Sequence, residues 1–436
     1  MAAKLFVISG ASGSGKTTLL NSLLNTQSTI FKARKYSTRA VRDKNDDIIH
    51  CPVIARDNFD LVYKLNEKTY GIKLNEIKEE LNKKNNLIII LSDIRVILRL
   101  KKELGDSIVT LYISSAINNS LIEKIQASRY KKDFHLNKEE SDIFYYQYLK
   151  LSSAANLKDW GRLFECMGEL FDKWEKYIPE RDSTEIRKKK IRDFHKTYID
   201  NIQYFDHVIL NHNLNNPAEM TRQALNIIDF YNTNDKKQIK KNPILFFVAA
   251  ASGSGKRLLM KSIRDVIGVD QVQIIRKEAK RDQKDDDDGS DGMIAIGENG
   301  EFSSDLDLRW TFHKGTIHKG TEYAVSKHEI TANINNNKTQ ILISNTRQIE
   351  RFKELFDNHV IFLYLHATRS DEDVKRYQYS RCKTIEEADQ RIKEIEDVHN
   401  SYIENISKFD HVLLNTEFPE DLYEQMFKLI DHYNNQ

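Results

Sequence analysis

The chain has 436 residues and a formal net charge of +2, with 40% hydrophobic and 30% charged residues. This length predicts two or three domains, and the near-zero net charge gives no electrostatic reason to expect a nucleic-acid or membrane partner. No apolar run approaches the ~20 residues that span a bilayer, and the first residues run directly into a strand pattern without the order of a signal peptide. The three cysteines, Cys51, Cys166 and Cys382, lie far apart and are interpreted as free thiols of a reducing compartment. We therefore expect a cytoplasmic protein.

The first element expected along the chain is a strand at Leu5–Ser9, followed at once by the glycine-rich stretch GASGSGKT at Gly10–Thr17 and by a helical pattern. This stretch fits G-x-x-x-x-G-K-[ST] in strand–loop–helix order, which is the context of a phosphate-binding loop (P-loop). Glycines let backbone N–H groups curl around phosphates, and the following helix directs its positive end at them. Lys16 is expected to act on the outer phosphates of ATP and the Thr17 hydroxyl to ligate Mg²⁺. An ordinary glycine-rich turn is the alternative. The predicted ATP-binding residues are Gly10, Ser12, Gly13, Ser14, Gly15, Lys16, Thr17 and Thr18.

Short apolar runs then alternate with helical patterns, which predicts a parallel sheet with crossover helices. The runs lack polar alternation, as expected for strands that are buried on both faces. A closing helix is expected to begin at Pro217, because proline suits the first helical turn. The further strands expected here are Leu87–Leu91, Ile108–Ile113 and His207–Asn211.

The same landmarks return later in the chain. FDHVILN at Phe205–Asn211 recurs as FDHVLLN at Phe409–Asn415, an offset of 204 (409 − 205). ASGSGK at Ala11–Lys16 recurs at Ala251–Lys256, an offset of 240 (251 − 11). Two ordered matches indicate a duplication with insertions at different places. The second set of expected strands is Ile244–Ala250, Gln340–Ser344, Val360–Leu365 and His411–Asn415, before a closing helix opened by Pro419.

We therefore predict an α/β protein of two P-loop NTPase domains with parallel sheets, at residues 1–234 and 235–436, joined by the lysine-rich connector Tyr231–Pro243. The first domain carries a helical insertion at about residues 130–180, with apolar side chains at steps of 3 and 4. This stripe either packs on the parent domain or forms a surface for a second copy of the chain or another partner. Its members are Leu157, Trp160, Phe164, Met167, Phe171 and Trp174. An acidic stretch in the second domain, Asp282–Gly292, is expected to be a mobile loop and not a calcium site, because Lys284 would hold the first ligand position.

The second glycine-rich stretch reads AASGSGKR and lacks two residues of the motif. Ala250 stands where the first glycine belongs and adds a Cβ at a tight turn. Arg257 stands where the hydroxyl belongs, and a guanidinium has no lone pair for a cation. Lys256 and the backbone could still hold an anion, but we expect a regulatory or structural role for this copy.

Beyond the first glycine-rich loop the chain resembles the guanylate kinase family. In YSTRAVRD, Arg39 and Arg42 have the spacing of the two arginines with which that family binds the acceptor phosphate, and TYGIK resembles its tyrosine–glycine turn, so Tyr70 would contact the same phosphate. Asp93 is similar in place to the family's acidic strand end near the acceptor and Mg²⁺. FDHVILN resembles the last strand, which borders the adenine. The resemblance implies a guanylate kinase-like fold and four catalytic groups, Lys16 and the lid arginines Arg129, Arg181 and Arg187.

Two positions depart from that family. Guanylate kinases read the base with an acid before the tyrosine–glycine turn and a hydroxyl after it, and these positions here are Leu61 and Ile72. Apolar groups cannot hydrogen-bond a guanine edge. The YGI turn and the strand end Ser344–Arg347 look more like the ribose 1,5-bisphosphate phosphokinases, which phosphorylate a sugar phosphate.

The leading expectation is an ATP- and Mg²⁺-dependent kinase that transfers the γ-phosphoryl group to a phosphate-bearing small molecule, a GMP-like nucleoside monophosphate, with the first domain catalytic. A sugar-phosphate kinase of the ribose 1,5-bisphosphate type and a non-catalytic nucleotide-binding scaffold are the alternatives. His195 and its repeat His399 lie in a helical pattern of both copies and are interpreted as structural.

Overall fold

The computed structural model describes residues 3–11, 13–41, 46–65, 68–115, 184–211, 217–233, 240, 242–268, 271–282, 292–312, 320–369, 371–382, 384–416 and 418–435. The chain divides into two units, one of Met1–Ala116 with Asp193–Gln436 and another of Ile117–Arg192. We call the described residues up to 233 the first half and those from 240 onward the second half.

The first half alternates strands and helices in the predicted manner. Its strands are β1 Leu5–Gly10, β2 Ile30–Lys32, β3 Tyr36–Ser37, β4 Ile49–His50, β5 Leu61–Leu65, β6 Lys68–Ile72, β7 Asn86–Ile90, β8 Ile108–Ser115 and β9 His207–Asn211. Its helices are α1 Lys16–Thr26, α2 Leu74–Asn82, α3 Ile94–Leu104, α7 Thr184–Asp200 and α8 Pro217–Thr233.

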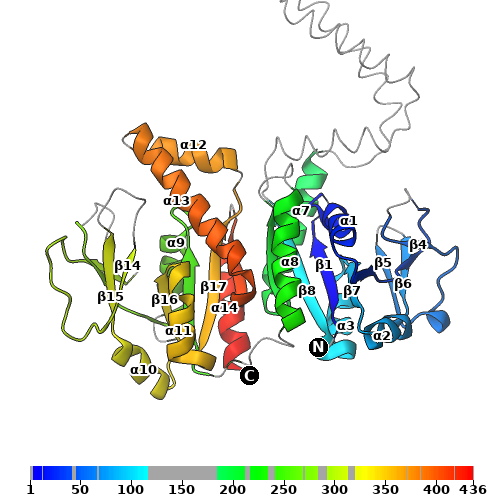
Figure 1. The fold of residues 1–436 in the computed structure, drawn as a ribbon, viewed down its shortest axis with the longest axis horizontal. Coiled ribbons are helices and arrows are strands. Elements are labelled where there is room, and N and C mark those ends of the chain that lie inside the picture. Colours follow the sequence, from blue (N-terminus) through cyan, green and yellow to red (C-terminus); the bar gives the residue numbers. More distant parts are fainter. Residues whose placement is uncertain are drawn as a thin grey trace, which may run out of the picture. The chain divides into compact units, whose positions relative to one another are not determined.

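A five-stranded parallel sheet in the order β2-β7-β1-β8-β9 forms the core of the first half (Figure 1). Every residue of β1, β7, β8 and β9 is buried, which explains why their sequences are apolar runs without alternation. Helices α1 and α2 pack on β7, α3 packs on β8 and α8 packs on β9. The four predicted strands are confirmed, and β2 is a fifth that the apolar runs did not indicate.

The short strands β3 to β6 form a separate mixed sheet in the order β4-β3-β6-β5. Sequence reasoning did not predict it, because strands of two to five residues show little periodicity. Arg39 follows β3, and Tyr70 lies on β6. We call the described residues of 34–72 the acceptor lobe, after the role that the sequence predicts for these two side chains.

The second half repeats this plan. Its strands are β10 Leu245–Ala250, β11 Gln273–Ile274, β12 Lys277–Ala279, β13 Met293–Ala295, β14 Leu308–Phe312, β15 Thr321–Val325, β16 Gln340–Ser344, β17 Val360–Ala367 and β18 His411–Asn415. Its helices are α9 Lys256–Ser262, α10 Lys327–Asn335, α11 Ile349–Phe356, α12 Asp371–Arg381, α13 Ile385–Glu404 and α14 Glu420–Asn434.

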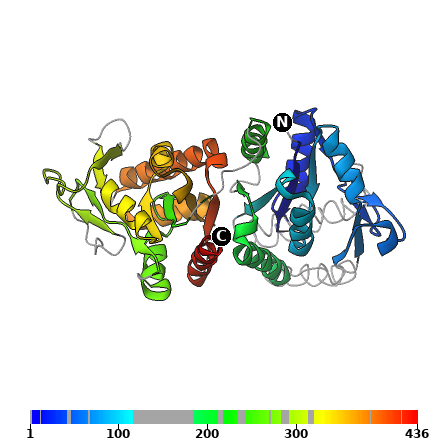
Figure 2. The same ribbon diagram turned by 90° about the horizontal axis from the view of Figure 1, so that it is seen from below.

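The parallel sheet of the second half has the order β11-β16-β10-β17-β18, position for position the order of the first. It also has a four-stranded companion sheet, β13-β12-β15-β14. Figure 2 shows the two halves from below, the first coloured from blue to green and the second from green to red. The α/β class and the duplicated strand order are therefore properties of the structure.

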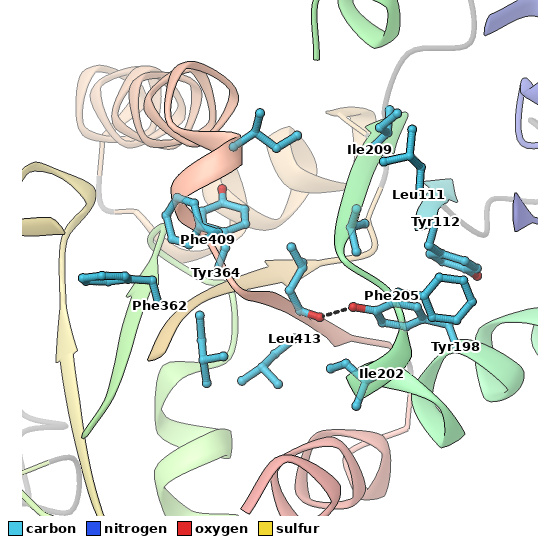
Figure 3. Packing of buried hydrophobic residues seen from close by; sticks show 14 of the residues in the cluster. Leu111, Tyr112, Tyr198, Ile202, Phe205, Ile209, Phe362, Tyr364, Phe409 and Leu413 are labelled. Carbon is cyan, nitrogen blue, oxygen red and sulfur yellow. Dashed lines mark hydrogen bonds between the residues drawn. The ribbon is translucent and has the colours of Figure 1, made fainter. Parts of the chain in front are cut away.

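Equivalent residues join the two halves. The Tyr198 hydroxyl of α7 donates to the Val412 carbonyl of β18 at 2.7 Å, and the Tyr402 hydroxyl of α13 donates to the Val208 carbonyl of β9 at 2.6 Å. Both pairs differ by the same 204 residues (402 − 198 and 412 − 208), so the contact is reciprocal. Tyr198 stacks on Tyr112 with ring centroids 4.4 Å apart. Figure 3 shows the hydrogen bond of the Tyr198 hydroxyl among the buried residues of one continuous core.

The closing helices and the connector between the halves differ in part from what the sequence predicts. The helix α8 begins at Pro217 as predicted, but Pro419 is the residue before α14 and not its first residue. The connector is shorter than expected, because Tyr231–Thr233 is the end of α8. The insertion at residues 130–180 with its apolar stripe, and the aspartates at 285–288, lie outside the described residues. Within the described part of the chain, none of the helices has the length and apolarity needed to cross a membrane.

Candidate phosphate-binding loop and acceptor lobe

The glycine-rich loop follows β1, the central strand of the parallel sheet, and leads into α1. Its backbone uses positive φ angles at Gly10 (147°), Gly13 (90°) and Gly15 (96°), which favour glycine. A Cβ on Gly10 would stand 2.8 Å from the Ile113 carbonyl oxygen and 2.8 Å from the Ser14 hydroxyl oxygen. The first motif glycine is therefore required both by the backbone angle and by space.

Residues from the end of the first half hold this loop. Asn211 at the end of β9 donates its amide to the Ser14 carbonyl at 2.9 Å. On α8, the Met220 methyl lies 2.9 Å from the point that a Cβ on Gly15 would occupy. Thr221 of the same helix donates its hydroxyl to Ser22 of α1 at 2.8 Å. None of these supports was predicted, although Asn211 belongs to the repeated FDHVILN segment.

The motif side chains differ in exposure. Lys16 donates its ammonium to the Gly10 and Ala11 carbonyls at 2.8 and 2.6 Å. Thr17 and Thr18 are exposed, as a metal-ligating or phosphate-binding hydroxyl must be. The Ser14 side chain is fully buried, and its hydroxyl has no hydrogen-bond partner among the described residues. A curled backbone, a helix N-terminus and an ammonium at one place suit the binding of an anion such as a polyphosphate.

The second glycine-rich loop keeps this shape, and a helix of its own half lies beside it. Gly253 and Gly255 have φ of 77° and 105°, and Lys256 donates to the Ala251 carbonyl at 2.6 Å. A Cβ on Gly253 would stand 3.1 Å from the Gln378 amide nitrogen and 3.3 Å from a ring carbon of Tyr377, both on α12. The helix α12 therefore lies against the loop that has lost the motif hydroxyl.

In the acceptor lobe, Arg39 is oriented by an acidic neighbour. Its two terminal nitrogens donate to the two carboxylate oxygens of Asp46, each at 2.7 Å. These hydrogen bonds raise the pKa of the guanidinium above its usual range, and Tyr70 adds to the shift. Tyr70 lies on β6 and stacks on Tyr63 of β5 with centroids 5.2 Å apart. The structure thus places Arg39 and Tyr70 beside each other.

A buried lysine beside this pair was missed by sequence reasoning. Lys35 is only 6% exposed, forms an ion pair with Asp47, and donates to the Ile90 carbonyl at the end of β7 at 2.8 Å. Its ammonium lies 5.9 Å from the Tyr70 ring centroid. Burial lowers the pKa of Lys35, although the Asp47 carboxylate opposes that shift. Lys35 stands among the charged residues of FKARKYSTR, directly before β3, so no sequence pattern marked it as buried.

Asp93 is the N-cap residue directly before α3 and lies three residues after the end of β7. One carboxylate oxygen accepts the Arg95 backbone N–H at 2.9 Å, and the other accepts from the Arg95 guanidinium at 2.7 Å. Burial alone would raise the pKa of Asp93, but the hydrogen bonds and charge of Arg95 lower it overall. Asp93 is close enough to Tyr63 that its charge helps to raise the pKa of that phenol. The carboxylate is therefore ionised beside the acceptor lobe, with Arg95 bound to it.

The two positions at which guanylate kinases read the base hold apolar side chains that are buried in the core. Leu61 and Ile72 are partners across β5 and β6 and are 2% and 0% exposed. Neither presents a polar group to a ligand.

The remaining predicted site residues are not all described. Ser12, Arg42, Arg129 and Arg181 lie outside the described residues, as does the side chain of Arg187, whose backbone belongs to α7. Within the described ranges, no group of three or more His, Cys, Asp or Glu side chains could hold a metal ion. His195 is 3% exposed and lies 3.4 Å from the Tyr112 hydroxyl, inside the core.

No protein-family model matches the chain, and no curated protein matches it. Among solved structures, the crystal structure of guanylate kinase from Anaplasma phagocytophilum is similar to part of it, with 12% sequence identity and a TM-score of 0.30 over 45% of this chain and 89% of that chain. A TM-score this low does not decide a fold. The class of this chain is therefore assigned from its own strand order and register.

Proposed function

We propose that the chain is an ATP-dependent phosphotransferase whose first half transfers the γ-phosphoryl group to a phosphate-bearing acceptor, with a nucleoside monophosphate as the leading candidate. The observation that carries this proposal is the loop Gly10–Thr17. It has the motif sequence, three positive-φ glycines, and a position between the central parallel strand and α1. Backbone N–H groups of this loop would bind the phosphates, and Lys16 would leave its contacts with Gly10 and Ala11 to reach the outer ones.

The acceptor would lie against the acceptor lobe. Arg39, Tyr70 and Arg42 would hold its phosphate. Arg39 would turn from Asp46 to do so, because both of its terminal nitrogens donate to that carboxylate. Holding both phosphates in fixed positions is the main contribution a protein makes to phosphoryl transfer. The lid arginines Arg129, Arg181 and Arg187 would stabilise the phosphoryl group in transfer.

Mg²⁺ would be held by the Thr17 hydroxyl and the phosphate oxygens, and it supplies charge neutralisation when bound. Thr17 is exposed at the start of α1 and fits this role. Asp93 fits less directly, because both of its oxygens accept hydrogen bonds from Arg95. We therefore propose Thr17 as the metal ligand and Asp93 as a group that reaches the metal or the acceptor after parting from Arg95.

The two domains would be residues 1–234 and 235–436, with catalysis in the first. Arg257 in place of the hydroxyl and α12 against Gly253 both support a regulatory or structural second domain. A second candidate function is a sugar-phosphate kinase of the ribose 1,5-bisphosphate type. It is favoured by Leu61 and Ile72, whose burial leaves no polar group at the base-reading positions.

An ADP-release assay with Mg·ATP and GMP, dGMP, AMP or ribose 1,5-bisphosphate tests these proposals. Turnover with a nucleotide supports the leading candidate, and turnover with the bisphosphate alone supports the second. A protein that binds ATP but transfers phosphate to none of the four would be a nucleotide-binding scaffold. Loss of ATP binding in Lys16→Ala, with binding retained in Lys256→Ala, would assign the nucleotide to the first loop.

A further inference from the structure

Two elements of the first half, β9 and α8, support the glycine-rich loop from behind. Asn211 ends β9 and donates to the Ser14 carbonyl, and Met220 of α8 fills the space beside Gly15. Thr221 ties α8 to α1. A shift of β9 or of the first turn of α8 would therefore change the shape of the loop.

The second half holds the same two elements. The Tyr402 hydroxyl donates to the Val208 carbonyl of β9 at 2.6 Å. The Asn226 amide of α8 donates to the Ile403 carbonyl at 3.0 Å. The Nε2 atom of His399, on α13, lies 3.1 Å from a carboxylate oxygen of Glu219. Glu219 directly precedes Met220 in α8. Both elements that support the loop are thus hydrogen-bonded to the second half.

The tyrosine contacts are reciprocal between the halves, but the histidine–carboxylate contact is not. Gln223 and Gln425 make equivalent hydrogen bonds to their own strands, which sets the offset of the two closing helices at 202 (425 − 223). Asp421 therefore stands at the position of Glu219 (219 + 202), and it accepts a hydrogen bond from Thr416. His195, the repeat of His399, has a buried Nε2 without a partner in the described part of the chain.

We propose that His399 is a positioning residue for the phosphate-binding loop of the first half, acting through Glu219 and the first turn of α8. The asymmetry carries the inference, because this histidine–carboxylate hydrogen bond is made on the side of the half whose loop keeps every residue of the motif and is not repeated at His195 and Asp421. A hydrogen bond to a carboxylate is stronger than one between neutral groups, so it restrains Glu219 more firmly. Glu219 is next to Met220, whose methyl packs beside Gly15 of the loop. The inference rests on the proposed function only in that the loop binds nucleotide.

Hydrogen exchange of the full-length protein tests the restraint without any need for turnover. Loss of one charge-assisted hydrogen bond is expected to speed the exchange of amides in the peptide covering residues 10–18 by about 3- to 10-fold in His399→Ala and in Glu219→Ala. The double variant should exchange no faster than either single variant, because both remove the same contact.

Lys196→Met is the matched control. Lys196 of α7 forms an ion pair with Glu424 of α14, across the same junction but on the side of the second loop. Its removal should leave exchange at residues 10–18 within 2-fold of wild type. Equal acceleration in this control would show that any weakening of the junction has the same effect, and would overturn a specific role for His399.

Nucleotide affinity gives a second measurement, with a fluorescent methylanthraniloyl derivative of ATP as the probe. We expect a 3- to 10-fold higher Kd in His399→Ala and a smaller change in Glu219→Gln, which keeps an acceptor oxygen but loses the charge. Unchanged exchange at residues 10–18 in His399→Ala would overturn the inference. A wild-type protein that fails to bind the probe would instead refute the proposed function, while the exchange result would still decide whether His399 restrains the loop.

Discussion

Replacing Gly10 with alanine places in the first loop the residue that the second loop carries at Ala250. The structure predicts two separate costs. A positive φ in a residue with a side chain costs about 1–3 kcal/mol. The new methyl would also stand 2.8 Å from the Ile113 carbonyl oxygen, a backbone atom of β8 that can move only with the sheet. Such overpacking costs a further 1–3 kcal/mol, roughly.

The collision, and not the backbone angle, is expected to damage nucleotide binding. At about 2–4 °C per kcal/mol, the combined cost should lower the melting temperature of Gly10→Ala by at least about 4 °C. Because Ser14 is the other contact at 2.8 Å, the loop itself must move, and we expect the Kd for Mg·ATP to rise at least about tenfold. Thermal melting and a nucleotide titration measure these two effects on the same samples.

Gly105 provides the matched control. It has φ 54°, but a Cβ there would meet no atom within 4 Å. In Gly105→Ala the melting temperature should therefore fall only by the cost of the positive φ angle, and nucleotide affinity should be unchanged. Ala250→Gly should change neither nucleotide affinity nor turnover. A Gly10→Ala protein with wild-type melting temperature and affinity would refute the reasoning, and an equal affinity loss in Gly105→Ala would show that the effect is not local.

Three further outcomes are expected. Lys16→Ala should abolish phosphoryl transfer while its melting temperature stays close to that of wild type. Lys256→Ala removes an ammonium with the same 2.6 Å contact to a loop carbonyl and should retain turnover. Equal losses of turnover in the two variants would contradict the assignment of catalysis to the first half. Arg39→Lys should raise the acceptor KM about tenfold with the ATP KM unchanged, because lysine cannot reproduce the bidentate geometry, and the reverse pattern would assign Arg39 to ATP. Burial lowers the pKa of His195 to about 4, so the unfolded chain binds the extra proton first, and stability is complete above the unfolded pKa of about 6.5 and falls as the pH drops toward 4. Urea unfolding from pH 8 to 4 should show this slope, and His195→Phe should make it shallower without removing it, because burial also lowers the pKa of His366, to about 3.

Much of the fold could be read from the sequence, because its central strands are buried on both faces. Burial of every residue in β1, β7 and β8 requires apolar runs, and those runs are visible without any knowledge of the neighbouring strands. The glycine-rich loop could also be predicted, because all of its signals lie in one short stretch of the chain. Its motif, strand and helix are contiguous, and the positive φ angles at Gly10 and Gly15 follow from the same residues that defined the motif.

The acceptor lobe was only partly predictable, because its contacts join residues whose separations have no fixed pattern. Arg39 and Tyr70 were named by resemblance, but the pairing of Arg39 with Asp46 and of Lys35 with Asp47 depends on how strands of two to five residues come together. A lysine at a strand end gives no sign in sequence that it will be buried against a tyrosine ring.

Repeated segments were visible in the sequence, but the contacts they make at the junction of the two halves were decided by tertiary structure. The repeated segments around Tyr198 and Tyr402 predicted two similar halves and did not say that each tyrosine would donate to the other half. Equal sequences specify equal local structures, whereas the junction between them depends on which surfaces remain apolar once each half has folded. The contact between His399 and Glu219 arises only there, since Asp421 and His195 hold the equivalent positions and make different hydrogen bonds.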